Sequence, residues 1–373
     1  MRKHGGRYVV RMSFRWFGRG YDHITLEQIR QIPGMEVVVT SLLDIPVGEV
    51  WPLERLKALR EEVESYGLKL EVIESVNVHE DIKLGLETRD SYIEKYIKTM
   101  KNLSQIGVKV ICYNFMPAFD WLRTELEYQL EDGSRTMAYR HDFVSKIDPE
   151  NFAEQFMEQS KDSELPGWEP ERLKEISRTI ERYKEMTEDK YWKNIKYFLD
   201  SIIPSAEECD IKMAIHPDDP PWPVFGLPRV ITGRENIRKF LDLNKSKYNG
   251  ITVCTGSLGA NRQNDIPAII REFGKEGRIH FAHIRNLKFT SDRDFYESAH
   301  LSKCGSLDMF EIVKAFYDVG FDGYMRPDHG RMIWGETGRP GYGLYDRALG
   351  AVYLQGLWEA IEKMANKYRT PAF

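Results

Sequence analysis

The chain has 373 residues, enough for two ordinary domains or for one large α/β barrel. Hydrophobic residues make up 42% and charged residues 30%, which is typical of a soluble globular protein with a sizeable core. The formal net charge is −5 and no dense run of Lys and Arg occurs, so neither nucleic acid nor an anionic membrane is expected as the main partner.

Cysteine usage and the N-terminus predict a cytoplasmic protein. The four cysteines lie far apart and form no CxxC pair, which fits a compartment in which thiols stay reduced. Residues 1–6 lack the apolar core and cleavage site of a signal peptide. No stretch approaches the ~18 uncharged apolar residues of a membrane-spanning helix, so no membrane association is expected.

Strand-like and helical runs alternate through the first part of the chain. Runs rich in β-branched and aromatic residues predict strands over residues 8–17, 35–42, 69–74 and 108–114. Helices are predicted over residues 26–32, 50–67 and 91–106, each stopped by a glycine or a proline. In the second helix Leu56, Leu59 and Val63 fall on one face, as expected for a helix that packs on a sheet.

This alternation stops after the fourth strand. Between Met116 and about Lys190 no run resembles a good strand, and polar turns are followed by a long charged helical stretch. We therefore expect a helical insertion over residues 116–190. A helix over residues 191–209 then supplies the displaced fourth helix.

Four more strand-like runs follow and complete the pattern. They end at positions 216, 254, 283 and 328, with helices predicted over residues 306–319 and 344–367. Eight strands alternating with helices predict an α/β fold of the (β/α)₈ TIM barrel class. We expect one catalytic domain over residues 1–373, with the insertion as a cap over the barrel mouth.

Each of the last four strands ends in a potential metal ligand: His216, Cys254, His283 and Asp328. The separations of 38, 29 and 45 residues (254−216, 283−254, 328−283) are each about one strand–helix unit and too long for a zinc finger. Strand ends converge above a barrel, so these side chains could hold a divalent ion and leave positions free for substrate and water. Each residue alone is more simply a buried core residue, but four at one level favour a metal site. The ligand types do not select among Zn²⁺, Mn²⁺, Fe²⁺ and Co²⁺.

Arginines near strand ends are candidates for binding an anionic substrate. Arg15, Arg285, Arg326 and Arg331 occupy such positions. A guanidinium there could clamp a carboxylate. An arginine is as often a solvated or packing residue, so no single one of them is decisive.

Other polar residues close to the predicted strand ends offer further chemistry. His79 and Asn114 could contact hydroxyl groups of a substrate, although a polar loop and simple packing explain them as well. His329 and Tyr342 follow Asp328 closely. An imidazole or a phenol beside a cation is a plausible acid/base partner. A surface turn is an equally simple explanation for Tyr342.

Nine motifs from about residue 12 to the final helix resemble those of the mannonate dehydratase family, a relative of xylose isomerase-like barrels. They are Phe14-Arg-Trp-Phe-Gly18, Gln28-Ile-Arg-Gln-Ile-Pro-Gly34, Asp44-Ile-Pro-Val-Gly-Glu-Val-Trp51, Glu74-Ser-Val-Asn-Val-His-Glu80, Asn114-Phe-Met-Pro117, Asp120-Trp-Leu-Arg-Thr124, Ile215-His-Pro-Asp-Asp-Pro-Pro221, Arg278-Ile-His-Phe-Ala-His-Ile-Arg-Asn286 and Arg326-Pro-Asp-His-Gly-Arg331. Together these motifs are highly specific for that family.

The resemblance implies loss of water from D-mannonate to give 2-keto-3-deoxy-D-gluconate in hexuronate (glucuronate) catabolism, with Mn²⁺ or Fe²⁺ assisting. It also supports the metal ligands named above. On this basis Tyr342 and His329 are expected to serve as the acid/base pair, in an order left open. The expected substrate-binding residues are Arg15, His79, Asn114, Arg285 and Arg331.

Two other functions remain as alternatives. A metal-dependent sugar isomerase or epimerase would use the same barrel and metal to polarise a carbonyl. A non-catalytic protein that binds sugar acids is a second possibility, which the complete set of ligand and acid/base positions argues against. A homo-oligomer, either a dimer or a tetramer, is expected in each case.

Overall fold

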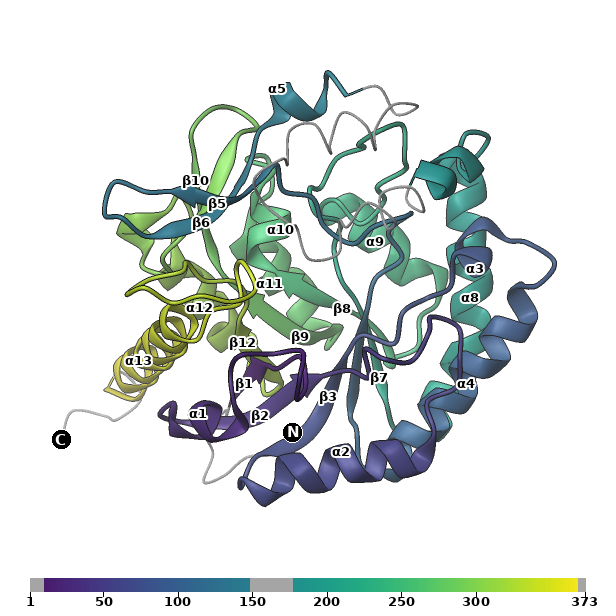
Figure 1. Cartoon of the computed structure of the whole chain (residues 1–373), viewed down its shortest axis with the longest axis horizontal. Coiled ribbons are helices and arrows are strands. Elements are labelled where there is room, and N and C mark those ends of the chain that lie inside the picture. Colours follow the sequence, from purple (N-terminus) through teal and green to yellow (C-terminus); the bar gives the residue numbers. More distant parts are fainter. Residues whose placement is uncertain (1–9, 148–176, 368–373) are drawn as a thin grey trace.

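The computed structural model describes residues 10–147 and 177–367, and eight parallel strands form a closed barrel at its centre (Figure 1). Around the barrel the strands follow the order β1-β12-β9-β8-β7-β4-β3-β2. Their bounds are β1 Arg11–Arg15, β2 Met35–Thr40, β3 Lys69–Glu74, β4 Val110–Tyr113, β7 Lys212–Ile215, β8 Asn249–Cys254, β9 Ile279–Ile284 and β12 Tyr324–Pro327. The predicted TIM barrel is therefore confirmed.

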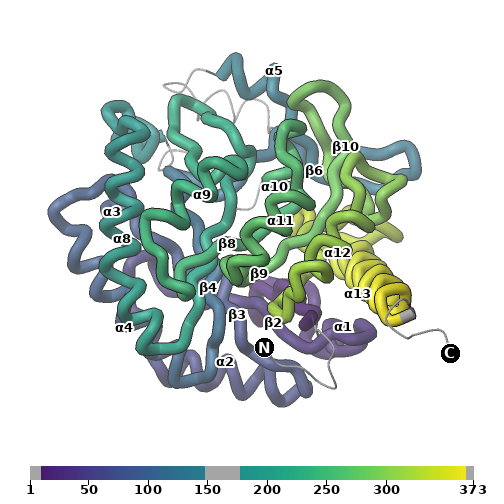
Figure 2. Tube along the Cα trace, turned by 180° about the vertical axis from the view of Figure 1, so that it is seen from behind, coloured from purple at the N-terminus to yellow at the C-terminus, as the bar shows by residue number. Residues whose placement is uncertain are grey.

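Helices form a layer on the outside of the barrel (Figure 2). The longer ones are α2 Leu53–Ser65, α4 Arg89–Gln105, α8 Glu188–Glu208, α9 Arg234–Leu243, α11 Ile266–Lys275, α12 Met309–Asp318 and α13 Tyr345–Lys367. Shorter ones are α1 Leu26–Gln31, α3 Glu80–Leu84, α5 His141–Val144, α10 Thr255–Gly259 and the 3₁₀ turn Ser302–Cys304. The six helices predicted with bounds start and stop within a few residues of them: α1, α2, α4, α8, α12 and α13.

The apolar pattern of the strands explains how they are covered on both sides. In β2, Val37 and Val39 point into the barrel, where they meet Val72 and Val110 from the next strands. Val38, between them, belongs to the larger core beneath the helices. Because both faces are buried, a parallel barrel strand appears as a continuous apolar run rather than as an alternation.

A second sheet, absent from our sequence prediction, stands beside the barrel mouth. It has four strands in the order β10-β11-β6-β5, with bounds β5 Glu125–Gln129, β6 Arg135–Tyr139, β10 Asn286–Phe289 and β11 Phe295–Ser298. The prediction that residues 116–190 contain no strand is thus wrong. Strands β5 and β6 form a hairpin inside that insertion, and β6 pairs antiparallel with β11, with Tyr139 opposite Phe295.

The remainder of the insertion is only partly described. Its described part also contains α5 and a helical turn at residues 177–182 before α8 begins. The helical stretch predicted across residues 148–176 lies outside the described residues. The cap function of the insertion stays a prediction.

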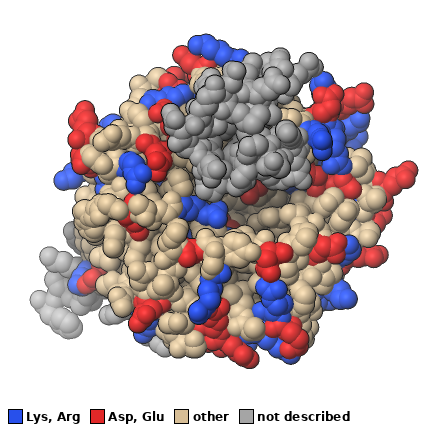
Figure 3. Space-filling model, in the orientation of Figure 1, with Lys and Arg blue, Asp and Glu red and all other residues tan. Residues whose placement is uncertain are grey.

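Both charge signs are interspersed over the face of the molecule that Figure 3 shows. This mixture is consistent with the absence of a basic run in the sequence. Within the described part of the chain, no helix combines the length and apolar character needed to cross a membrane.

Candidate active site

A cavity of about 580 Å³ opens where the barrel strands end. Its size suits a small-molecule ligand. The predicted site residues that line it are Arg15, His79, Asn114, His216, Arg285, Asp328, His329 and Tyr342. Cys254 and His283 are fully buried and contact the lining residue Asp328.

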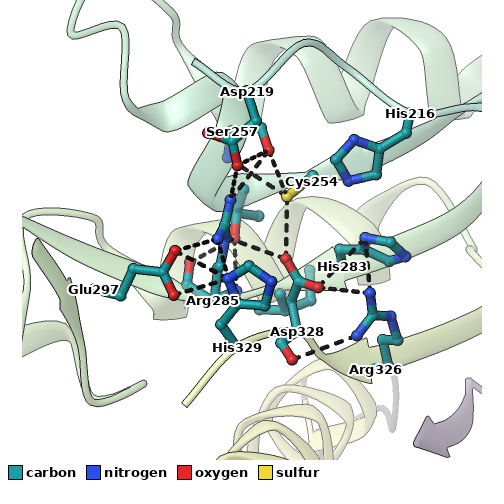
Figure 4. Close-up of polar contacts among 12 residues, drawn as sticks. His216, Asp219, Cys254, Ser257, His283, Arg285, Glu297, Arg326, Asp328 and His329 are labelled. Carbon is teal, nitrogen blue, oxygen red and sulfur yellow. Dashed lines mark hydrogen bonds and ion pairs between the residues drawn. The ribbon is translucent and has the colours of Figure 1, made fainter. Parts of the chain in front are cut away.

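Three of the predicted metal ligands converge beside this cavity (Figure 4). The ligand atoms of His216, Cys254 and His283 all lie within 4.8 Å of one another. The barrel register explains why, because Cys254 and His283 are direct partners on the neighbouring strands β8 and β9. His216 follows β7, which is the next strand in the barrel.

Asp328, the fourth predicted ligand, borders this group. Its carboxylate lies 3.4 Å from Cys254 Sγ and 3.6 Å from His283 Nδ1. It also contacts Arg326 at 2.7 Å and Arg285 at 3.1 Å. Burial by itself would raise the pKa of Asp328, but Arg326 and the other positive neighbours outweigh it and hold the pKa well below its ordinary value. Asp328 is therefore an ionised carboxylate that is available as a ligand.

The donor atoms fit a divalent cation on two observations. His216 Nδ1 lies 2.7 Å from the carbonyl oxygen of Pro217. A carbonyl only accepts, so Nδ1 carries the hydrogen and Nε2 keeps its lone pair for a metal. His283 Nε2 is buried and forms no hydrogen bond among the described residues, although the Glu74 carboxylate lies 3.3 Å from it, and metal ligation would relieve this state.

A second group of potential ligands, Glu74, Cys112 and His283, lies on the other side of the same imidazole. It is less suited to a cation because its thiol is harder to ionise. Burial and the neighbouring Glu74 raise the pKa of the Cys112 thiol well above its ordinary value, so a thiolate is disfavoured. We therefore favour the group that contains Cys254.

Tyr342 and His329 form a hydrogen-bonded pair at the cavity wall. The Tyr342 hydroxyl lies 2.9 Å from His329 Nε2, and both oxygens of Glu297 lie within 2.9 Å of His329 Nδ1. A carboxylate only accepts, so Nδ1–H donates to Glu297, and Nε2 is left to accept from the phenol. Burial and the nearby Asp328 raise the pKa of Tyr342 to about 12. The sequence predicted the pair but not Glu297, which holds its orientation.

Arg285 lines the cavity, but its guanidinium is engaged by protein carboxylates. It contacts Asp219 at 2.6 Å, Glu297 at 2.5 Å and Asp328 at 3.1 Å. Arg285 Nη1 also lies 2.5 Å from His329 Nδ1. Both nitrogens carry hydrogens and cannot bond each other, so each donates to the Glu297 carboxylate instead. Arg285 therefore holds the site together, and its positive charge is already matched by protein carboxylates.

Arg123, from the insertion, completes this buried network. It bonds both oxygens of Asp219 at 2.8 and 3.0 Å and Glu297 Oε1 at 2.7 Å. Burial by itself would raise the pKa of Glu297, but Arg285, His329 and Arg123 lower it to about 2. Two arginines and two carboxylates thus fix the backbone segments that carry His329 and the strand end of β9.

Three of the predicted substrate-binding residues line the cavity: Arg15, His79 and Asn114. His79 Nδ1 accepts from the Asp81 amide at 3.1 Å, so its Nε2 carries the hydrogen, and its ring stacks on Tyr92. Asn114 Oδ1 accepts from the Met116 amide at 3.2 Å. Arg15 is buried and donates to main-chain carbonyls and to a hydroxyl rather than to a carboxylate.

Arg331 is not placed to bind substrate, contrary to our prediction. It is absent from the cavity lining. Its guanidinium binds Asp346 at 3.0 Å and Asp132 at 2.9 Å, the latter in the turn between β5 and β6. The physical reason is that Asp346, at the start of α13, also accepts from the Arg331 amide at 2.8 Å and turns the side chain away from the cavity.

Five residues of the site escaped the sequence reasoning: Glu74, Arg123, Asp219, Glu297 and Arg339. The first three stand in motifs that supported the family resemblance, so a search of those motifs for charged residues could have found them. Glu297 and Arg339 lie in segments with no local signal. Arg339 lines the cavity from the loop that leads to Tyr342.

Comparisons with known proteins show which family the chain belongs to. Residues 10–368 match the family model described as D-mannonate dehydratase (UxuA). A mannonate dehydratase of Thermotoga neapolitana is 62% identical over 359 residues, 96% of this chain and 100% of the relative. A mannonate dehydratase of Lactococcus lactis subsp. cremoris is 55% identical over 356 residues, 95% of this chain and 99% of the relative.

Solved structures give the same answer. The crystal structure of mannonate dehydratase from Streptococcus suis serotype2 superposes with a TM-score of 0.85 at 44% identity, covering 96% of this chain and 95% of that one. An L-ribulose 3-epimerase matches with a TM-score of 0.57 at 10% identity, covering 98% of this chain and 100% of that one, which shows a shared fold alone. The chain belongs to the D-mannonate dehydratase family, a family of hydro-lyases.

Proposed function

We propose that this protein removes water from D-mannonate to give 2-keto-3-deoxy-D-gluconate. The observation that carries the proposal is the meeting of two groups in one cavity. A set of metal-ligand side chains around Cys254 lies on one side of Asp328, and the hydrogen-bonded pair of Tyr342 and His329 lies on the other. Membership of the family supplies the identity of the substrate.

The reaction needs stabilisation of negative charge and two proton transfers. The C2 proton lies beside a carboxylate, so its removal builds charge on a group that is already anionic. His216, Cys254, His283 and Asp328 would hold Mn²⁺ or Fe²⁺, which when bound supplies the positive charge that makes this step possible.

The chain's own acid/base groups are Tyr342 and His329, and we assign the two proton transfers to them as a pair. One takes the C2 proton, and the other delivers a proton to the departing C3 hydroxyl. Their mutual hydrogen bond of 2.9 Å lets a proton pass between them and restore the starting state. Glu297 keeps the imidazole in the tautomer whose Nε2 faces the cavity.

His79 and Asn114 are proposed to contact the hydroxyl groups of the bound sugar acid. His79 Nε2 carries a hydrogen and is free to donate, since its Nδ1 accepts from a main-chain amide. Burial lowers the pKa of His79, which keeps the ring neutral and suited to a hydroxyl rather than to an anion. The Asn114 amide nitrogen is likewise a donor.

The test is an anaerobic assay of the purified protein with D-mannonate, with and without added Mn²⁺, in which 2-keto-3-deoxy-D-gluconate is measured. Metal-dependent formation of this 2-keto acid is expected. A sugar product of unchanged formula would instead identify an isomerase or epimerase, and tight binding without any product would identify a binding protein.

The role of Tyr342 is tested by the Tyr342→Phe variant. It removes the hydroxyl and little else, so kcat should fall by roughly 10²-fold or more while the metal content stays at the wild-type level. Tyr345→Phe is the matched control, because Tyr345 lies three positions further on with 42% of its side chain exposed. Wild-type turnover by Tyr342→Phe would remove the phenol from the mechanism.

Two further expectations complete the proposal. The substrate and product place the reaction in hexuronate (glucuronate) catabolism in the cytoplasm. We also expect the protein to assemble as a homodimer or a homotetramer, which light scattering coupled to size-exclusion chromatography measures directly.

A further inference from the structure

The four arginines that line the cavity fall into two pairs. Arg285 and Arg326 each contact at least two carboxylates at 3.1 Å or less. Their charge is neutralised by the protein. Across residues 10–147 and 177–367, by contrast, no carboxylate forms an ion pair with Arg15 or Arg339.

Arg15 and Arg339 approach the same aromatic ring. The guanidinium carbon of Arg15 lies 4.4 Å from the centre of the Phe17 ring, and that of Arg339 lies 4.1 Å from it. The Phe17 ring in turn meets Tyr342 edge to face, with 4.8 Å between ring centres. The two cations therefore lie next to the proposed acid/base pair.

The charge of Arg15 is costly in this position. Its side chain is only 6% exposed and donates to the carbonyls of Trp16 and Val39 and to the Ser41 hydroxyl. Burial lowers the pKa of Arg15 to about 10, and the nearby Arg339 contributes in the same direction. A buried charge is ordinarily matched by an opposite charge, and the described part of the chain supplies none here.

The nearest protein acid does not supply that anion. Glu74 favours the charged form of Arg15, but its carboxylate pairs with Arg326 at 3.1 Å and lies beyond ion-pair distance of Arg15. Arg339 stacks on Phe17 and is half-buried at the cavity wall. Two guanidiniums that face one cavity without a counter-ion form a site for an anionic group of the ligand.

We propose that Arg15 and Arg339 form the carboxylate-binding subsite of the cavity and select sugar acids over neutral sugars. This inference rests on the proposed function for the identity of the sugar acid. It moves the carboxylate-binding role away from Arg285 and Arg331, whose donors are engaged by protein acids. With the carboxylate held beside Phe17, the adjoining C2 lies on the side of the cavity where Tyr342 stands.

Arg339→Gln is the variant that tests the subsite, because Arg339 is half-buried on a loop and its replacement leaves the barrel core intact. A charge-assisted hydrogen bond is worth about 1.5–3 kcal/mol, so KM for D-mannonate should rise by roughly 10- to 150-fold. The effect on kcat should be smaller, since the reacting groups are untouched. Arg339→Lys should recover part of the loss, because it restores the charge but not the planar fork.

Arg19→Gln is the matched control. Arg19 lies in the loop that follows β1, but its side chain is 77% exposed and pairs with Glu62 outside the cavity. Its replacement should leave KM unchanged. An Arg339→Gln variant with wild-type KM, or with a KM no higher than that of Arg19→Gln, would overturn the subsite.

A second measurement separates this inference from the proposed function. D-Mannonate should raise the unfolding temperature of the Mn²⁺-loaded wild-type protein, D-mannitol should raise it much less, and Arg339→Gln should abolish the difference. If the wild-type protein shows this preference without turnover, the subsite stands and the proposed reaction fails. If mannitol stabilises the wild-type protein as well as mannonate does, the subsite is refuted whether or not the enzyme is active.

Discussion

Replacing Glu297 with glutamine should destabilise the protein and slow the reaction through two separable effects. Glu297 is 2% exposed and binds Arg123, Arg285 and His329 at once. Glutamine keeps the shape and one acceptor oxygen but removes the negative charge. Arg123 would then keep only Asp219 as a carboxylate partner among the described residues, and Arg285 would keep Asp219 and Asp328.

The size of the stability effect follows from the pKa of Glu297. Its neighbours lower this pKa from 4.5 to about 2, a difference that corresponds to about 3 kcal/mol at 1.36 kcal/mol per pKa unit. Removal of one partner of a buried ion pair costs about 3–5 kcal/mol, which agrees. A carboxyl whose pKa is lowered on folding stabilises the protein above pH 4.5 and loses that contribution as the pH falls towards 2. The difference in the free energy of unfolding between the wild type and Glu297→Gln should therefore be largest at pH 7 and shrink below pH 4.5.

The kinetic effect comes from the loss of imidazole orientation. Without the carboxylate, His329 is free to adopt the other tautomer, in which Nε2 carries the hydrogen and faces the phenol of Tyr342. By analogy with other anchored imidazoles, kcat should fall on the order of 10²- to 10⁴-fold while the metal content is unchanged. Urea denaturation, metal analysis and steady-state kinetics measure the three quantities.

Glu127→Gln provides the control for this prediction. Glu127 lies on β5 of the same sheet and pairs with Arg135 at 2.6 Å, but half of its side chain is exposed. An exposed pair contributes at most about 1 kcal/mol, so this variant should behave as wild type. A Glu297→Gln variant with wild-type kcat would show that Glu297 does not orient the imidazole. If the free energy of unfolding of Glu297→Gln equals that of the wild type, the buried ion pairs add no net stability.

Three further predictions test the metal site, the pH dependence and the loop that carries Tyr342. Cys254→Ala should weaken metal binding at least about 10-fold by equilibrium dialysis, whereas Cys112→Ala should not; equal losses would favour the alternative ligand group. Burial lowers the pKa of His280 well below 6.5, so stability should fall as the pH drops below 6.5, and His280→Gln should flatten that slope in denaturation experiments at pH 5–7. Arg347 donates to the carbonyls of Gly343 and Tyr342, so Arg347→Lys should lower kcat more than it raises KM; unchanged kinetics would contradict this role.

The barrel could be predicted from the sequence because its strands are signalled locally. Each is an apolar run closed by a turn residue, and the strand ends of a barrel meet by geometry rather than by any feature of distant sequence. Placing His216, Cys254 and His283 near one another required only that each stands at a strand end, and the structure brings them together. What they bind was not contained in that pattern, since N and S ligands suit several metals.

The second sheet could not be predicted in the same way. Its strands have only four or five residues, and its two hairpins pair with each other across more than 150 positions of the chain, as Tyr139 does with Phe295. In β5, Glu125 and Glu127 are exposed on one face, and exposed and buried positions alternate as in a sheet with one solvent-facing side. The run is too short for this alternation to predict a strand. Glu297 therefore carried no signal, although it is the residue that orients His329.

Arginine roles were the least predictable part of the site, for a related reason. An arginine near a strand end has the same local sequence whether it binds substrate or a protein acid. Arg331 is held by Asp346 and by Asp132, which lies 199 positions earlier. Only the tertiary positions of the acids decide which guanidiniums are left over, and in this cavity those are Arg15 and Arg339.

The position of the insertion has a chemical consequence that the barrel alone does not explain. Arg123 and strand β6 come from the insertion, and β6 pairs with β11, which carries Glu297. Thr136 of β6 donates from its hydroxyl to the Glu297 carbonyl at 2.7 Å, so the insertion fixes the backbone of this residue as well as its charge. The metal-ligand group at Cys254, by contrast, is built from barrel strand ends only. The site therefore has two supports: the barrel positions the proposed metal ligands, and the second sheet, through Glu297, positions His329 of the proposed proton-transfer pair.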